Sequence, residues 1–93
     1  MPATHTDNER TASIRVTIRI PHGSDRDLGT EATARLSRAA EIEDVTVTRL
    51  RGLEPRLSAT VVTLEVMVRT SVGDGELGTK LRAVPGVSTV EIP

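Results

Sequence analysis

The C-terminal segment leaves the backbone few choices. Apolar side chains recur at helical spacing over 77–84, and the pair Pro85-Gly86 follows them directly. Proline cannot donate a backbone hydrogen bond and moves the residue before it out of the helical region, whereas glycine can take the positive φ that reverses the chain. A short alternating run, 87–92, comes next. We therefore predict a helix over 74–84 that ends at this pair and leads at once into a strand.

An earlier segment has the same order of elements. Apolar and polar residues alternate over 13–20, which predicts a strand with one buried face. After a Pro-His-Gly turn, Ser24 offers an N-cap, and Asp27 adds a negative charge at the positive end of a helix that we place at about 25–40. A second strand follows, and we expect one side of it to carry Val45, Val47, Arg49 and Arg51.

Two further features lie between these units. Residues 60–69 place valine and leucine on one face and a partly apolar set on the other, so we expect this third strand to be central in the sheet. A turn at 52–55 joins it to the second strand as a hairpin.

Asp74 is a natural N-cap for the last helix, and Gly78 within that helix suggests close packing on the sheet.

These elements predict an α+β chain of order βαββαβ. Right-handed crossovers place both helices on one face of a four-stranded antiparallel sheet with strand order 4-1-3-2, a ferredoxin-like sandwich. We expect a single domain over 13–93 and a disordered N-terminal tail over 1–12. The chain has no Phe, Tyr or Trp, so its core must be aliphatic. A small aliphatic core buries little area, which favours a homo-oligomer, either a dimer or a larger assembly.

Composition argues against several classes of function. The chain has no cysteine, so it holds no disulfide framework and no cysteine-based zinc site. A formal net charge of -1 does not favour nucleic acid, and the chain lacks the aromatic side chains on which RNA bases stack. No apolar run approaches membrane-spanning length, so we expect a cytoplasmic protein with no membrane partner. We expect the uncovered sheet face to be solvated, with charges paired across strands; it would carry Arg15, Thr17, Arg19, Thr63, Glu65 and Arg69.

Signals for catalysis are equally few. The two histidines, His5 and His22, are too far apart in the sequence to converge at helical spacing on a metal. His22, Asp25 and Asp27 could meet a divalent cation within one loop, but acids at a helix N-terminus are expected there without any metal. The sequence has no nucleophile elbow and no phosphate-binding glycine loop. We therefore expect no enzyme, no metal and no cofactor.

Two stretches carry a family resemblance. The run Ile18-Arg-Ile-Pro-His-Gly-Ser-Asp-Arg-Asp-Leu-Gly29, with Glu43-Asp-Val-Thr-Val47 after the helix, resembles the opening of an ACT domain, a small regulatory amino-acid-binding module. The closing run Leu81-Arg-Ala-Val-Pro-Gly-Val-Ser-Thr-Val-Glu-Ile92 is similar to the end of ACT domains in ppGpp synthetases and related regulators. The resemblance covers about residues 13–92. It implies a regulatory domain that pairs edge to edge and holds an amino acid at the interface, near the loop between the first strand and the first helix.

The resemblance places the candidate site in the loop 21–30. There Gly29 would let a backbone approach the ligand, amides at the helix start would hold a carboxylate, and Asp25 or Asp27 would meet an ammonium group. The alternative is that Gly29 only eases packing of the helix start and that the acids only cap the helix. The candidate ligand-binding residues are His22, Ser24, Asp25, Asp27, Leu28, Gly29 and Thr30.

Three functions therefore remain in view. The preferred one is a non-catalytic, amino-acid-sensing regulatory domain that acts as a homo-oligomer. A domain of this fold without a small ligand could instead be an interaction or assembly module that uses exposed sheet edges. The chain is also somewhat similar to the cytosolic C-terminal domain of MgtC-type membrane proteins, which implies a transporter-associated domain as a further alternative.

Overall fold

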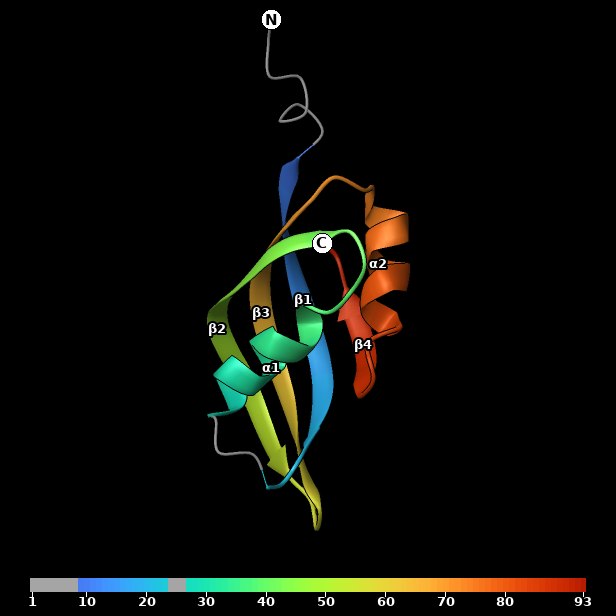
Figure 1. Ribbon diagram of the computed structural model, residues 1–93. Coiled ribbons are helices and arrows are strands. Elements are labelled where there is room, and N and C mark those ends of the chain that lie inside the picture. Colours follow the sequence, from blue (N-terminus) through green and yellow to red (C-terminus); the bar gives the residue numbers. More distant parts are fainter. Residues whose placement is uncertain (1–8, 24–26) are drawn as a thin grey trace, which may run out of the picture.

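The structure is a computed structural model that describes residues 9–23 and 27–93 (Figure 1). Within those residues the elements follow the predicted order and form one four-stranded sheet and two helices, an α+β arrangement. The elements are β1 (Arg10–Pro21), α1 (Leu28–Leu36), β2 (Ile42–Pro55), β3 (Ala59–Thr70), α2 (Asp74–Arg82) and β4 (Val87–Glu91).

The strands pair antiparallel throughout the sheet, in the order β2-β3-β1-β4. Read from the β4 edge, the same sheet is β4-β1-β3-β2, and the arrangement is compatible with a ferredoxin-like fold. β1 and β3 pair without a register shift from Arg10↔Thr70 to Pro21↔Ala59. The predicted central position of the third strand is confirmed, because β3 has a partner on each side.

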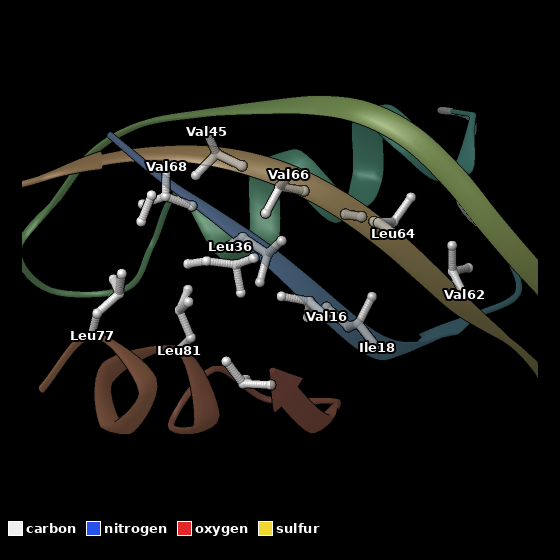
Figure 2. Packing of buried hydrophobic residues seen from close by; sticks show 14 of the residues in the cluster. Val16, Ile18, Leu36, Val45, Val62, Leu64, Val66, Val68, Leu77 and Leu81 are labelled. Atoms are coloured by element: carbon white, nitrogen blue, oxygen red, sulfur yellow. The ribbon is translucent and has the colours of Figure 1, made fainter. Parts of the chain in front are cut away.

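The core lies between one face of the sheet and both helices. Even-numbered residues of β1 from Ala12 to Ile20 are buried, and those of β3 from Val62 to Thr70 are buried beside them. The buried side chains of both helices join this same aliphatic cluster, so both helices cover the same face (Figures 1 and 2). Figure 2 shows Leu77 and Leu81 pointing from α2 toward Leu36 of α1 and the sheet.

β1 begins earlier than predicted, so the expected tail over 1–12 and the domain start at 13 are corrected. Residues 10–12 belong to the strand because β3 extends far enough to pair with them. Arg10 secures this end of the strand: its Nε donates to the Val72 carbonyl oxygen at 2.8 Å, and its guanidinium lies 2.7 Å from the Asp74 carboxylate. Residues 1–8 lie outside the described residues.

α1 is shorter than the predicted 25–40. Its N-cap is Asp27, and the predicted cap, Ser24, lies outside the described residues. At the other end, the amides of Arg38 and Ala39 bond to carbonyls three residues earlier, at 3.2 and 3.1 Å, which tightens and ends the helix. Glu41 then takes a positive φ of 68°, and the buried Thr70 hydroxyl donates to its carbonyl oxygen at 2.7 Å. This contact with β3 directs the chain into β2.

α2 starts at the predicted residue, but its N-cap differs from the prediction and it ends two residues earlier. The helix spans Asp74–Arg82, its N-cap is Gly73, and Asp74 lies in the first turn, where it pairs with Arg10. Gly78 is buried, but the atom nearest to an added Cβ there would be a guanidinium nitrogen of Arg82, at 3.2 Å. The glycine therefore makes room for the Arg82 side chain and not for the sheet backbone.

The reversal after α2 is confirmed. Gly86 has φ 94°, and its carbonyl oxygen accepts a hydrogen bond of 2.8 Å from the Arg19 amide. A Cβ at this position would lie 2.7 Å from the Arg19 carbonyl oxygen, closer than real Cβ atoms approach. Only glycine satisfies both the backbone angle and the close approach to β1.

β2 has three register shifts against β3, and they correct the prediction for its faces. Val45 and Val47 pair with Val68 and Val66 on the helix-covered side. A shift between Val47 and Arg49 then places Arg49 opposite Glu65, whose side chain is on the uncovered side. One extra residue in a strand reverses the side on which the following side chains lie. Val45, Val47, Arg49 and Arg51 therefore do not share one side.

Candidate functional site

The structure divides the predicted ligand-binding residues into separate places. His22 lies at the end of β1, where its amide donates to the Ser58 carbonyl oxygen at 3.0 Å and its Nε2 is 3.3 Å from the Thr60 hydroxyl. Leu28 is partly buried against the hydrophobic core. Ser24 and Asp25 lie outside the described residues. Three of the predicted residues come together along one hollow: Asp27, Gly29 and Thr30.

This hollow, of about 490 Å³, lies between α1 and β2. Three further residues line it, Thr33 and Ala34 from α1 and Val47 from β2. The two α1 residues were missed, although helical geometry places them next to Thr30 at three and four positions along the chain. No local signal in the sequence places Val47 here, because β2 reaches α1 only through the tertiary fold. We call these six residues the α1–β2 hollow.

The negative charge of the α1–β2 hollow belongs to Asp27. Its Oδ1 accepts the Thr30 amide at 2.8 Å, and its Oδ2 accepts the Thr30 hydroxyl at 3.1 Å. These bonds favour the charged form, the amide bond most, and hold the pKa of the carboxyl below its usual value of 3.8. The Thr30 amide, which was expected to hold a ligand carboxylate, is therefore occupied by a carboxylate from the chain itself.

The threonine hydroxyls add acceptors and no free donor. Thr30 donates its hydroxyl proton to Asp27, and Thr33 donates to the Gly29 carbonyl oxygen at 2.9 Å. A hydroxyl that has given its proton still offers lone pairs. The polar side chains of the hollow therefore suit a ligand that donates hydrogen bonds, while Ala34 and Val47 suit a small apolar body.

Gly29 is not required by close packing in this structure. A Cβ there would meet Asp27 Oδ1 at 3.5 Å, an ordinary van der Waals distance. Neither of the two roles considered for Gly29 follows from its surroundings. Asp27 is a helix cap, as the alternative interpretation of the acids expected.

The uncovered sheet face has paired charges at its centre, as predicted. Arg15 donates to Glu65 across the β1–β3 pair at 3.1 Å, and Arg51 of β2 lies 3.7 Å from the same carboxylate. The hydrogen bond from Arg15, with the positive charges nearby, lowers the pKa of Glu65. Beside this group, the Thr17 and Thr63 hydroxyls are 3.2 Å apart. These interactions are satisfied within the chain and identify no ligand.

Beyond this geometry, the described part of the chain holds neither a metal-binding cluster nor a membrane-spanning helix. In residues 9–23 and 27–93, no three histidine, aspartate or glutamate side chains gather in a way that could hold a metal ion. Over the same described residues, no helix combines the length and apolar character needed to cross a membrane. Comparison with family models, curated proteins and solved structures finds no match for this chain.

Proposed function

We propose that the chain is a non-catalytic binding domain that takes a small ligand in the α1–β2 hollow and acts as a homo-oligomer. The observation that carries the proposal is the convergence of Asp27, Gly29 and Thr30, all from the predicted loop, on one hollow beside the sheet edge. This is the region in which the ACT resemblance implies that an amino acid binds. A regulatory, amino-acid-sensing role is the function that this position supports best.

The hydrogen bonds of the hollow refine the ligand chemistry. An ammonium group would find the ionised Asp27 and the lone pairs of two threonine hydroxyls, whereas a carboxylate would meet Asp27 where it was expected to bind amides. The amino group should therefore contribute more to binding than the carboxylate. Among amino acids, those with a small aliphatic side chain fit the apolar contribution of Ala34 and Val47.

A thermal-shift series tests this proposal. The common amino acids are screened first. Leucine is then compared with 3-methylbutylamine, which lacks the carboxylate of leucine, and with 4-methylpentanoic acid, which lacks its amino group. A ligand that binds only the folded state raises Tm, and we expect leucine and the amine to raise it by at least about 4 °C at saturation. A shift produced by the deaminated acid alone would contradict the proposed ligand chemistry.

A pair of matched variants locates the ligand. Ala34→Leu fills the α1–β2 hollow with a strong helix former at a position that is not fully buried. It should keep its own Tm and lose the ligand shift. The control, Ala83→Leu, changes an exposed residue of a second hollow of about 310 Å³ near the ends of the two helices and should retain the shift. If the ligand changes the Tm of both variants equally, the ligand does not bind in the α1–β2 hollow.

The alternative of an interaction module has its own supporting observation. Leu50 and Leu53 are 51% and 50% exposed, and both lie on β2, an edge strand of the sheet. Exposed leucines beside open backbone groups favour association with another chain. If no amino acid or amine changes Tm, the ligand role is wrong and this alternative replaces it. A Tm that rises with protein concentration supports self-association with or without a ligand.

A further inference from the structure

We propose that two copies of the chain pair through the outer edge of β2, antiparallel, with Thr46 on the twofold axis. This inference rests on the homo-oligomer proposed above and names its surface and register. It does not depend on the small ligand.

The outer edge of β2 has no partner in the described part of the chain. The sheet order ends at this strand, which pairs with β3 along its other side. Apolar side chains line the helix-covered side of the edge, and two of them, Leu50 and Leu53, are about half exposed. This set is Ile42, Val45, Val47, Leu50 and Leu53.

The backbone directions show which residues of β2 offer hydrogen bonds outward. The Arg19 amide bonds to Gly86 at the β4 side of β1, and the His22 amide bonds to Ser58 at the β3 side. In a regular strand the direction of the backbone N–H and C=O groups alternates from one residue to the next. The backbone groups of even-numbered β1 residues and of their even-numbered β3 partners therefore point toward each other. Odd-numbered β3 residues therefore point toward β2. The backbone groups of Thr46, which is opposite Met67, therefore point toward β3. Those of Val45 and Val47, on either side of it, point away from β3, toward the open edge.

This pattern fits an isologous strand pair. With Thr46 facing its own copy, Val45 of each chain faces Val47 of the other, and each pair can exchange two backbone hydrogen bonds. The register shifts of β2 fall on both sides of this centre, between Ile42 and Asp44 and between Val47 and Arg49. β2 thus has one extra residue on each side of Thr46. An extra residue in one copy is matched by one in the other copy, so the two strands are in register again beyond these bulges.

Side-chain chemistry matches along this register. On the helix-covered side, Ile42 of one copy comes opposite Leu50 of the other, so apolar groups meet. On the uncovered side, Asp44 comes opposite Arg49 of the second copy, and symmetry creates this pair twice. Opposite charges directly across two strands stabilise the pairing. The strand is thus self-complementary in shape, apolarity and charge.

The bulges also explain the choice of a second copy over an arbitrary strand. Irregular, charged edges resist regular strands, which is how many proteins avoid aggregation. A strand without matching bulges would fall out of register after Val45 or Val47, whereas a copy of β2 carries the same irregularities. Self-pairing is therefore favoured and unselective pairing is opposed.

Charge reversal and mixing test the register. Sedimentation velocity over about 1 to 200 µM measures the monomer–dimer equilibrium of the full chain. Asp44→Arg alone brings two Arg–Arg pairs to the interface, and Arg49→Asp alone brings two Asp–Asp pairs. We expect each variant to dimerise about tenfold more weakly than the wild type, or weaker still. In a mixture of the two variants both interface pairs become Arg–Asp, so a mixed dimer should form with wild-type strength.

The mixture separates the interface from effects within one chain. Asp44 is opposite Arg69 and Arg49 is opposite Glu65 in the same molecule, and mixing leaves those altered contacts unrepaired. Arg38→Asp, an exposed substitution with the same charge change, should leave dimerisation unaltered. A wild-type dimer that resists both reversals, or a mixture that forms no mixed dimer, overturns this register but not self-association. A wild-type chain that stays monomeric overturns both, and the thermal-shift result for the ligand still stands.

Discussion

At the residue scale, single backbone and side-chain groups connect distant parts of the chain. Gly86 brings the end of α2 against β1, where its carbonyl oxygen accepts the Arg19 amide at 2.8 Å. Arg10 performs a similar role at the other end of β1 through Val72 and Asp74. In both cases a local preference is stabilised by a contact with a residue far away in the sequence.

Gly86→Ala tests the first of these contacts. Alanine at φ 94° would be strained, and its Cβ would collide with the Arg19 carbonyl oxygen 2.7 Å away. We expect the free energy of unfolding to fall by about 2 kcal/mol or more in urea titrations. The matched control is Gly75→Ala, in α2, where nothing lies within 4 Å of an added Cβ. That substitution should raise the stability by about 0.5 to 1 kcal/mol, because alanine is the better helix former. Equal effects of the two would contradict the close approach.

At the element scale, the boundaries of the elements depend on what each end contacts. α1 begins where the Asp27 carboxylate accepts the Thr30 amide. It ends where backbone amides bond to the carbonyl three residues earlier instead of four. β2 changes its exposed side where an extra residue shifts its pairing with β3. The same shifts that remove the simple alternation of β2 produce the self-complementary edge proposed above.

The start of α1 should make stability depend on pH. The pKa of Asp27 is lowered in the folded state, so the folded chain binds its proton less readily than the unfolded chain. Its contribution is complete above the usual pKa of 3.8 and is lost as pH falls through the lower folded value. Asp27→Asn removes this titration while keeping a capping side chain. The difference in Tm between wild type and variant should therefore shrink from about pH 6 to about pH 2.5. A difference that does not change with pH would contradict the role of the charge.

At the scale of the whole molecule, stability depends on one aliphatic layer. Helices α1 and α2 cover the same face of the sheet, and their buried leucines belong to one hydrophobic cluster with the strands (Figure 2). Without aromatic side chains, each buried residue contributes modest area, and closing the layer requires both helices. The other face is polar and charged, with Glu65 between Arg15 and Arg51.

Leu36→Ala tests this dependence on a single layer. Leu36 is fully buried between α1 and the sheet, and truncation should lower the free energy of unfolding by roughly 2 to 5 kcal/mol. The matched control, Leu57→Ala, makes the same change at a fully exposed leucine in the β2–β3 turn and should change the stability by less than about 0.5 kcal/mol. Chemical denaturation of both variants at the same protein concentration gives the comparison. A small loss for Leu36→Ala would show that the layer repacks without it.

Much of the fold was predictable because it follows from local chemistry. Strict alternation in β1 and β3 identifies a strand and its buried side, since side chains point to alternate faces. The Pro85-Gly86 pair ends a helix and reverses the chain through the conformations that its two residues allow. The α+β class and the order of elements follow from these signals. Three of the seven candidate site residues, Asp27, Gly29 and Thr30, do line one hollow.

The remainder depends on contacts that no short window of sequence contains. Whether residues 10–12 join β1 depends on how far β3 extends beside them. The sides of Arg49 and Arg51 depend on bulges that exist only relative to a paired strand. His22 does not line the hollow, because its side chain lies against Thr60 of β3. Val47 does line it, because β2 passes beside α1. Conformational preference acts over a few residues, whereas register and enclosure are set where distant segments pack, and there the tertiary structure decides.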